Sequence, residues 1–166
     1  MSDLFHEDVP TSFIRRVWAV MGKTPRHNYQ ILTKRPARMA IETAGLPLLE
    51  NVWLGTSVED ESVLDRLDEL RKSSAAVRFV SFEPLLGSVA RADLSGIHWA
   101  IVGGESGPRA RYMDSAWVCE IETICRQSKT AFFFKQWGGR NKKKSGRTYR
   151  GRVFNEMPSA YSSSSP

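Results

Sequence analysis

The stretch that decides the fold runs IHWAIVGGESG from Ile97 to Gly107. Its first half is apolar and β-branched, which predicts a buried strand, and its second half, from Gly103 on, predicts a loop at the carboxyl end of that strand. Glycine lets a backbone approach a ligand closely, while Glu105 and Ser106 add a carboxylate and a hydroxyl at the same place. An ordinary strand-to-helix turn is the simpler explanation of an isolated Gly-Gly pair. We favour a ligand site because four other segments of the chain end in a similar way.

The size and composition of the chain favour a single globular domain. Its 166 residues, 41% of them hydrophobic, suffice for one hydrophobic core. No apolar run reaches the length of a membrane span, and the first residues are acidic where a signal peptide is basic and then apolar, so we expect a cytoplasmic protein with no membrane partner.

The residues that most often bind metals are few and scattered. Cys119 and Cys125 lie six positions apart on a predicted helix, about 240° around its axis, so they do not easily share a metal or a disulfide from one face. His6, His27 and His98 are far apart in the sequence. We therefore predict no metal site in this chain.

The net charge of +6 comes from one part of the chain. Seven cations and no acid lie between Arg140 and Arg152, which leaves 17 cations against 18 acids elsewhere. A block of this kind often contacts phosphates, and it is as often a solvated, partly disordered end of a chain. The candidates for nucleic-acid contact are Arg140, Lys142, Lys143, Lys144 and Arg147.

Helix and strand patterns alternate along the chain at short intervals. This alternation predicts parallel strands joined by right-handed crossovers, and therefore an α/β fold. We expect one folded domain at residues 1–139, a basic carboxyl-terminal segment at 140–158 and a disordered tail at 159–166. The expected elements are a helix capped by Thr11 or Ser12 and ended by Gly22, a strand at 28–32, a helix at 36–44, a strand at 51–54, a helix capped at Ser57 and Asp60, strands at 76–82 and 97–102, a helix at about 114–126 and a strand at 131–134.

Polar side chains follow each of the five predicted strands. In parallel α/β sheets and barrels, ligands bind at the carboxyl ends of the strands. We expect Glu83 and Glu105 to lie on neighbouring loops, with Lys34 and Lys135 placed to neutralise them or to hold an anionic ligand. The full set of predicted rim residues is Thr33, Lys34, Arg35, Ser57, Glu59, Glu83, Gly103, Gly104, Glu105, Ser106, Lys135, Gln136 and Trp137.

The chain contains the strings MSDLFH at 1–6, LTKR at 32–35, NVWLG at 51–55, SVE at 57–59, EPLLG at 83–87, VGGESG at 102–107, FFKQWGG at 133–139 and GRVFNEMP at 151–158. Together these strings closely resemble the uncharacterised phage gene product 37/68 family. The resemblance is specific and extends almost from end to end of the chain. It implies a phage or prophage protein with a partial or complete (β/α) barrel, here of about five parallel strands, similar to radical S-adenosylmethionine proteins. Intact members would carry out redox or radical chemistry, with nucleic acid as one candidate substrate.

The cysteine content differs from that of the family. The family's cysteine-rich segment, which would hold an iron–sulfur cluster, lies ahead of the position that Met1 matches, and only two cysteines occur here. The resemblance thus implies a truncated or split protein with no cofactor of its own. S-adenosylmethionine and a [4Fe–4S] cluster would require a cysteine-bearing partner chain. Gly103-Gly104-Glu105 resembles the Gly-Gly-Glu string that meets the methionine amino group in the radical enzymes.

Two functions of different classes remain open. In the first, the chain supplies the substrate half of a radical-type barrel to a cysteine-bearing partner. In the second, it is a cluster-free phosphate or nucleic-acid binding module, in which Lys34, Arg35 and the basic block contact phosphates and Trp137 offers a stacking face. An open half-barrel would expose the edge of the strand at 28–32, which favours a partner chain or a homodimer.

Overall fold

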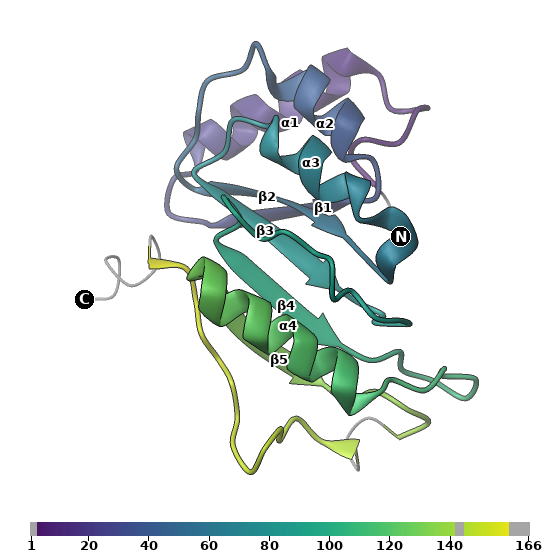
Figure 1. Cartoon of the computed structure of the whole chain (residues 1–166). Helices are drawn as coiled ribbons and strands as arrows, with labels where there is room; N and C mark the ends of the chain where they lie inside the picture. The colour runs from purple at the N-terminus through teal and green to yellow at the C-terminus, as the bar shows by residue number, and fades with distance from the viewer. Residues whose placement is uncertain (1–2, 142–144, 160–166) are drawn as a thin grey trace.

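The computed structural model describes residues 3–141 and 145–159 and contains one sheet of parallel strands (Figure 1). The strands lie side by side in the order of the sequence. They are β1 (Tyr29–Thr33), β2 (Val52–Ser57), β3 (Val77–Phe82), β4 (Trp99–Gly103) and β5 (Ala131–Gln136). Among these strands β1 pairs only with β2 and β5 only with β4, so the sheet is open. The predicted α/β class with five parallel strands is confirmed, and the sheet does not close into a barrel.

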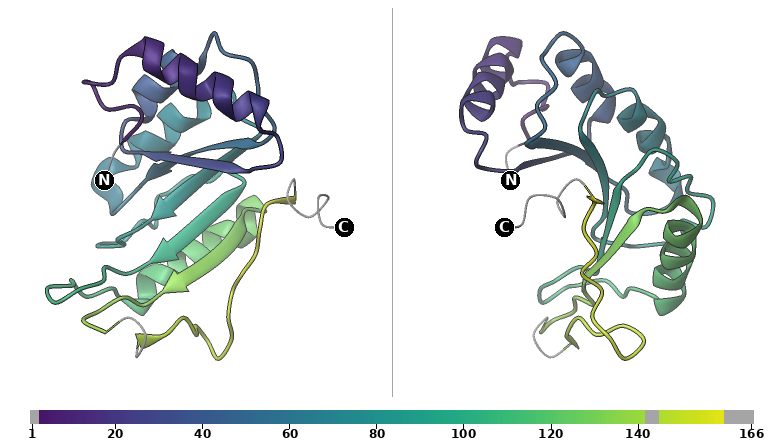
Figure 2. Two further views of the ribbon diagram at one scale, coloured as in Figure 1. Left: turned by 180° about the vertical axis from the view of Figure 1, so that it is seen from behind. Right: turned by 90° about the vertical axis from the view of Figure 1, so that its left-hand side faces the viewer.

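The helices of the described chain cover one side of this sheet. They are α1 (Thr11–Lys23), α2 (Pro36–Thr43), α3 (Asp65–Arg71) and α4 (Ser115–Ser128), with a short 3₁₀ helix, η1 (Glu61–Val63), ahead of α3. Figure 2 shows that the sheet is curved and that the helices lie on its convex side. Residues 83–98, which connect β3 to β4, contain no helix. None of the helices in the described ranges is long and apolar enough to cross a membrane.

The two faces of the sheet have different cores, because successive side chains of a strand point to opposite sides. Leu54, Val80 and Phe132 belong to the large core on the helix side. The concave side carries a smaller aromatic cluster of Trp53, Val77, Phe79 and Trp99, against which Ile101, Ala131, Phe133 and Met157 pack. This concave cluster is a packed layer, so any ligand on that side must bind at the ends of the strands.

Some predicted boundaries need correction. β2 continues through Ser57, so this residue ends a strand and does not cap a helix. Asp60 is a cap, but of η1, where its carboxylate accepts a hydrogen bond from the backbone N–H of Ser62. The first helix begins at Thr11 itself after Pro10, without a side-chain cap. In each case the pattern predicted the element, and tertiary packing decided where it ends.

The basic carboxyl-terminal segment is partly built into the core. Tyr149 and Phe154 are buried, and their rings contact Phe132. The segment runs antiparallel along the outer edge of β5, where the N–H of Phe134 donates to the carbonyl of Phe154 at 3.1 Å. The predicted disordered tail at 159–166 lies, apart from Ser159, outside the described residues, as do Lys142, Lys143 and Lys144.

Glu156 bonds the carboxyl-terminal segment to α4 and β5. Its carboxylate accepts two hydrogen bonds from Arg126, at 2.7 and 2.9 Å, and one from the N–H of Phe132 at 3.0 Å. The hydrogen bond from Arg126 is the main cause that lowers the pKa of Glu156 below its usual value of 4.5. A lowered folded-state pKa means that the carboxylate stabilises the fold above that usual value and loses this effect as the pH falls through the lowered pKa.

We expect Glu156→Gln to lower the free energy of unfolding by about 1 kcal/mol at neutral pH, because the replacement keeps the shape and loses the charge. The difference from the wild type should shrink as the pH falls from the usual carboxyl value of 4.5 through the lowered folded-state pKa, because over this range the unfolded wild-type chain binds a proton that the folded chain does not. Urea unfolding at a series of pH values measures it. Glu50→Gln, at an exposed position, is the control. A Glu156 variant that behaves like this control at neutral pH would show that the contact contributes nothing.

Candidate functional site

The predicted rim residues gather at the carboxyl ends of the strands, on or beside the concave face. Ser57 is paired in register with Ser81, and Phe82 with Val102, so the ends of the central strands are level with one another. In a parallel sheet the carboxyl ends of all strands lie at the same end of the sheet. Loops that are distant in sequence therefore meet here. Three glutamates on these loops each have a cationic partner.

Glu59 follows β2 and is paired with two cations. The Nζ of Lys34 forms an ion pair with Oε1 of Glu59, and Nη1 of Arg66 lies 2.9 Å from Oε2. Arg66 also donates to the carbonyl of Ser57 at 2.9 Å. Lys34 therefore neutralises Glu59. The prediction that it would neutralise Glu83 or Glu105 was wrong.

Glu83 follows β3 and pairs with Lys135 of β5, as expected from the sequence. The lysine Nζ lies 3.1 Å from Oε1 and 3.2 Å from Oε2 of Glu83. The hydroxyl of Ser81 donates to Oε2 at 3.1 Å. A Cβ atom on Gly103 would lie only 2.5 Å from Oε1, so the absence of a side chain at this position makes room for the Glu83 carboxylate.

Glu105 pairs with Arg111, a residue that sequence reasoning missed. Arg111 donates to the carboxylate from Nε at 2.8 Å, from Nη2 at 3.1 Å and from its backbone N–H at 3.0 Å. These hydrogen bonds lower the pKa of Glu105 to about 2, so it is ionised throughout the physiological range. Both partners lie on one loop, and no periodic pattern in the sequence identifies such a pair.

The glycines after β4 and β5 serve loop packing. A Cβ on Gly104 would lie 2.1 Å from the carbonyl oxygen of Trp137, and one on Gly138 would lie 2.2 Å from that of Glu105. The N–H of Gly104 donates to the carbonyl of Gln136 at 3.0 Å, so this backbone group is already paired within the chain. In addition, Nε2 of Gln136 donates to the hydroxyl of Ser106 at 2.8 Å. These contacts join the two loops to one another.

Trp137 is less available for stacking than its loop position suggested. Its ring centroid lies 4.8 Å from that of Phe134 and 6.0 Å from that of Tyr149. Its indole N–H donates to the carbonyl of Thr148 at 2.8 Å. The ring is thus part of the packing that holds the carboxyl-terminal segment.

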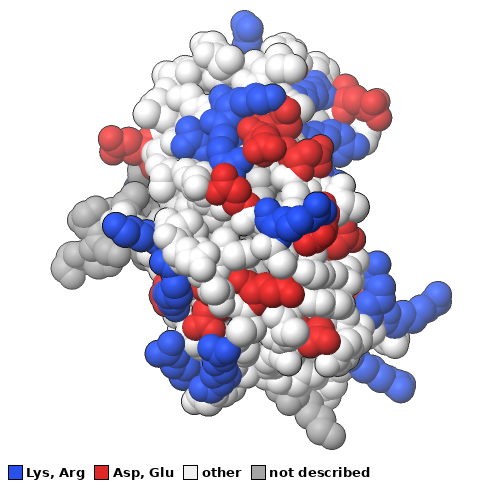
Figure 3. Space-filling view, viewed as in Figure 1, with Lys and Arg blue, Asp and Glu red and all other residues white. Residues whose placement is uncertain are grey.

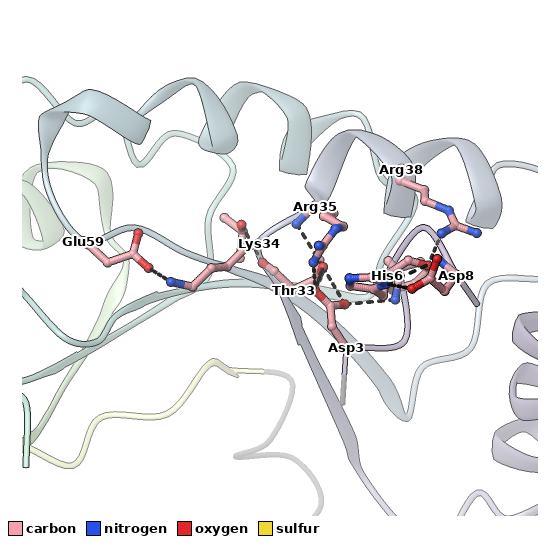
Figure 4. Close-up of polar contacts among 10 residues, drawn as sticks. Asp3, His6, Asp8, Thr33, Lys34, Arg35, Arg38 and Glu59 are labelled. Carbon is pink, nitrogen blue, oxygen red and sulfur yellow. Dashed lines mark hydrogen bonds and ion pairs between the residues drawn. The ribbon is translucent and has the colours of Figure 1, made fainter. Parts of the chain in front are cut away.

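The amino-terminal turn meets the end of β1 (Figure 4). The hydroxyl of Thr33 lies 2.8 and 2.9 Å from the two carboxylate oxygens of Asp3, and Nη1 of Arg35 lies 3.0 Å from Oδ2. Sequence reasoning missed Asp3 and the neighbouring His6, since these contacts span about 30 residues and leave no local pattern.

The basic block does not form one positive surface in the described residues. Arg147 lies over the ring of Phe133 at 5.3 Å and bonds to Asn155, while Arg150 pairs with Glu122 at 3.1 Å. Arg140 is exposed. On the face seen in Figure 3, cations and acids are mixed over the middle of the molecule, while several cations at the lower right edge have no acid beside them.

The cysteines do not fit an iron–sulfur cluster. Cys119 and Cys125 both lie on α4, on the convex side of the sheet, and burial raises the pKa of Cys125 to about 12. A cluster needs several thiolates that converge on one point. Within residues 3–141 and 145–159, no three His, Cys, Asp or Glu side chains are placed to hold a metal ion together.

Comparison with known proteins identifies the family of this chain. No curated protein and no solved structure matches it. The family described as "Protein of unknown function (DUF5131)" matches residues 1–158, which is nearly the whole sequence. The chain therefore belongs to the DUF5131 family.

Proposed function

We propose that this chain supplies the substrate half of a radical S-adenosylmethionine-like (β/α) barrel, and that a cysteine-bearing partner chain completes the barrel beside β1. The substrate would lie against the rim of Glu59, Glu83 and Glu105 and their cationic partners. The partner would supply the iron–sulfur cluster and S-adenosylmethionine, since the cysteines of this chain do not fit that role.

One observation carries the proposal: an open, curved parallel sheet whose helix-free side ends in a row of charged side chains. In (β/α) barrels the interior is filled by side chains and the active site is built on the loops at the carboxyl ends of the strands. The concave cluster around Trp99 corresponds to such a filled interior. The ion pairs at the rim are at least partly exposed and contribute little to stability. Their accumulation at the carboxyl ends of the strands therefore favours a role in binding.

The free edge of β1 is the place where further strands would pair. The N–H of Tyr29 donates to the carbonyl of Asn51, ahead of β2. Since backbone polar groups of successive strand residues point to alternate sides, those of Gln30 and Leu32 face away from β2. Both side chains are exposed. An edge that pairs with no other strand within residues 3–141 and 145–159 is a template for another strand.

We expect Gln30→Pro to weaken the complex with the cysteine-bearing partner at least about tenfold, because proline removes the N–H that would donate to the added strand. Gln30→Thr, which keeps the N–H, is the matched control. The partner to test is the cysteine-rich reading frame that the proposal expects next to this gene, co-expressed with this chain, and binding is measured by titration calorimetry. Cleavage of S-adenosylmethionine by the complex, absent from either chain alone, is the activity readout.

Three results would overturn the proposal. The first is that the DNA beside this gene contains no cysteine-rich reading frame. The second is a pair of chains that do not associate, and the third is a complex whose affinity is the same for Gln30→Pro and Gln30→Thr. A homodimer that the proline variant disrupts would reassign the edge to a second copy of this chain.

The alternative, a cluster-free phosphate or nucleic-acid binding module, has less support. Lys34, Arg35 and Arg150 each already form an ion pair with an acid of this chain. Such pairs must be broken or shared before the cations can bind phosphates. Nucleic-acid binding through Lys142, Lys143 and Lys144 stays a prediction about residues outside the described part of the chain.

A further inference from the structure

A pocket of about 490 Å³ lies at the carboxyl end of β1 and β2, under the amino-terminal turn. We call it the β1–β2 pocket. It lies at one end of the rim, and its walls include residues that the sequence did not point to. The lining residues are Asp3, His6, Val9, Leu32, Thr33, Lys34, Arg35 and Ser57.

Ser57 is the most informative of these residues. It is only 5% exposed, and it ends β2 on the concave side. Its carbonyl accepts a hydrogen bond from Arg66, but its hydroxyl has no hydrogen-bond partner among residues 3–141 and 145–159. A hydroxyl both donates and accepts hydrogen bonds, so this group at the pocket wall is suited to a ligand.

The charges around the pocket favour an anion. Among the lining residues, Lys34 and Arg35 are cations and Asp3 is the one carboxylate. Glu59, the partner of Lys34, is also paired with Arg66. The side chains of Lys34 and Arg35 are 57% and 38% exposed. A guanidinium has five N–H donors and an ammonium has three, so each cation has donors left for a ligand (Figure 4).

The remaining wall is apolar. Val9 and Leu32 line the pocket, and Leu32 is 39% exposed although it is a large aliphatic side chain. A pocket with apolar walls and a few convergent polar groups is typical of sites for small organic ligands.

We propose that the β1–β2 pocket binds a small organic anion, a carboxylate or a phosphate monoester with an apolar body. Its charged group contacts Lys34 and the hydroxyl of Ser57, and its apolar body lies on Leu32 and Val9. Arg35, turned toward Asp3, adds a second positive charge to the wall (Figure 4). This assignment rests on the proposed function, because it gives the rim its class of substrate. Binding to this chain alone nevertheless needs no partner, so its failure and that of the barrel proposal are separable.

The test is an amide NMR titration of the full chain with phenyl phosphate, with benzoate and with neutral benzyl alcohol. Phenyl phosphate, benzoate or both should shift the amides of Thr33, Lys34 and Ser57, and which of them binds identifies the anionic group. We expect Ser57→Ala to weaken binding about fivefold and Lys34→Gln at least about tenfold. Lys23→Gln, at an exposed position at the end of α1, should bind as the wild type does.

A melting curve of each variant shows that the fold is intact. The assignment is overturned if neither anion binds at about 10 mM, or if benzyl alcohol binds as tightly as the anions. Wild-type affinity in both folded pocket variants also overturns it, because the anion would then bind elsewhere.

Discussion

Replacing Trp99 with alanine is expected to lower the free energy of unfolding by about 4 kcal/mol, because a large buried ring is lost from the concave face. Trp99 is only 5% exposed. Its ring centroid lies 5.9 Å from that of Trp53, 6.0 Å from that of Phe79 and 5.7 Å from that of Phe133. Its indole N–H also donates to the carbonyl of Glu156 at 2.9 Å, so the change removes one contact of the carboxyl-terminal segment.

Chemical denaturation at neutral pH measures this effect. Tyr112→Ala is the control, since this aromatic side chain is 77% exposed and its loss should change the unfolding free energy by less than about 0.5 kcal/mol. A Trp99 variant within about 1 kcal/mol of the wild type would mean that the concave face is not a packed layer.

Gly104→Ala should destabilise the chain by about 3 kcal/mol and lower the melting temperature by about 10 °C. The new Cβ would lie 2.1 Å from a backbone oxygen of Trp137, and backbone cannot move aside as a flexible side chain can. Gly103→Ala should cost less, because its Cβ would meet only the carboxylate end of Glu83 at 2.5 Å. Gly45→Ala, with nothing within 4 Å of its Cβ, should be neutral.

The order of these three variants in a thermal melt is the informative result. A Gly104 variant as stable as the Gly45 variant would show that the loops after β4 and β5 are not interlocked, and the Gly-Gly pair would then be free to serve a ligand. Since the substitution is the same in all three, differences in residue type cannot explain the order.

The sheet could be predicted from the sequence, because apolar runs such as residues 99–102 alternate with helix patterns, which is typical of a parallel sheet with crossovers. The same reasoning placed Glu83 and Lys135 together, since both follow strands whose carboxyl ends share one edge. Reasoning from the sequence failed to find ion-pair partners that are far apart in the chain, because such contacts leave no local pattern. Asp3 reaches Arg35 from the amino-terminal turn, and Arg66 reaches Glu59 from α3.

The carboxyl-terminal segment was harder to predict for a different reason. Its cations dominate the composition, which suggested a solvated end, while its two aromatic residues Tyr149 and Phe154 decide where it lies. The spacing of two aromatics within a basic block was the signal that could have identified a docked segment. Pockets are less predictable still, because the space beside Ser57 depends on the rotamers of several distant side chains.

Amide hydrogen exchange at Gln30 and Leu32 tests the completion of the barrel most directly. In the chain alone both amides should exchange rapidly, because they face away from β2 at the edge of the sheet. In the complex with the cysteine-bearing chain they should become strongly protected, while Tyr29, already bonded to Asn51, should change little. Equal exchange rates at Gln30 and Leu32 with and without the partner would contradict the proposal that a second chain completes this barrel.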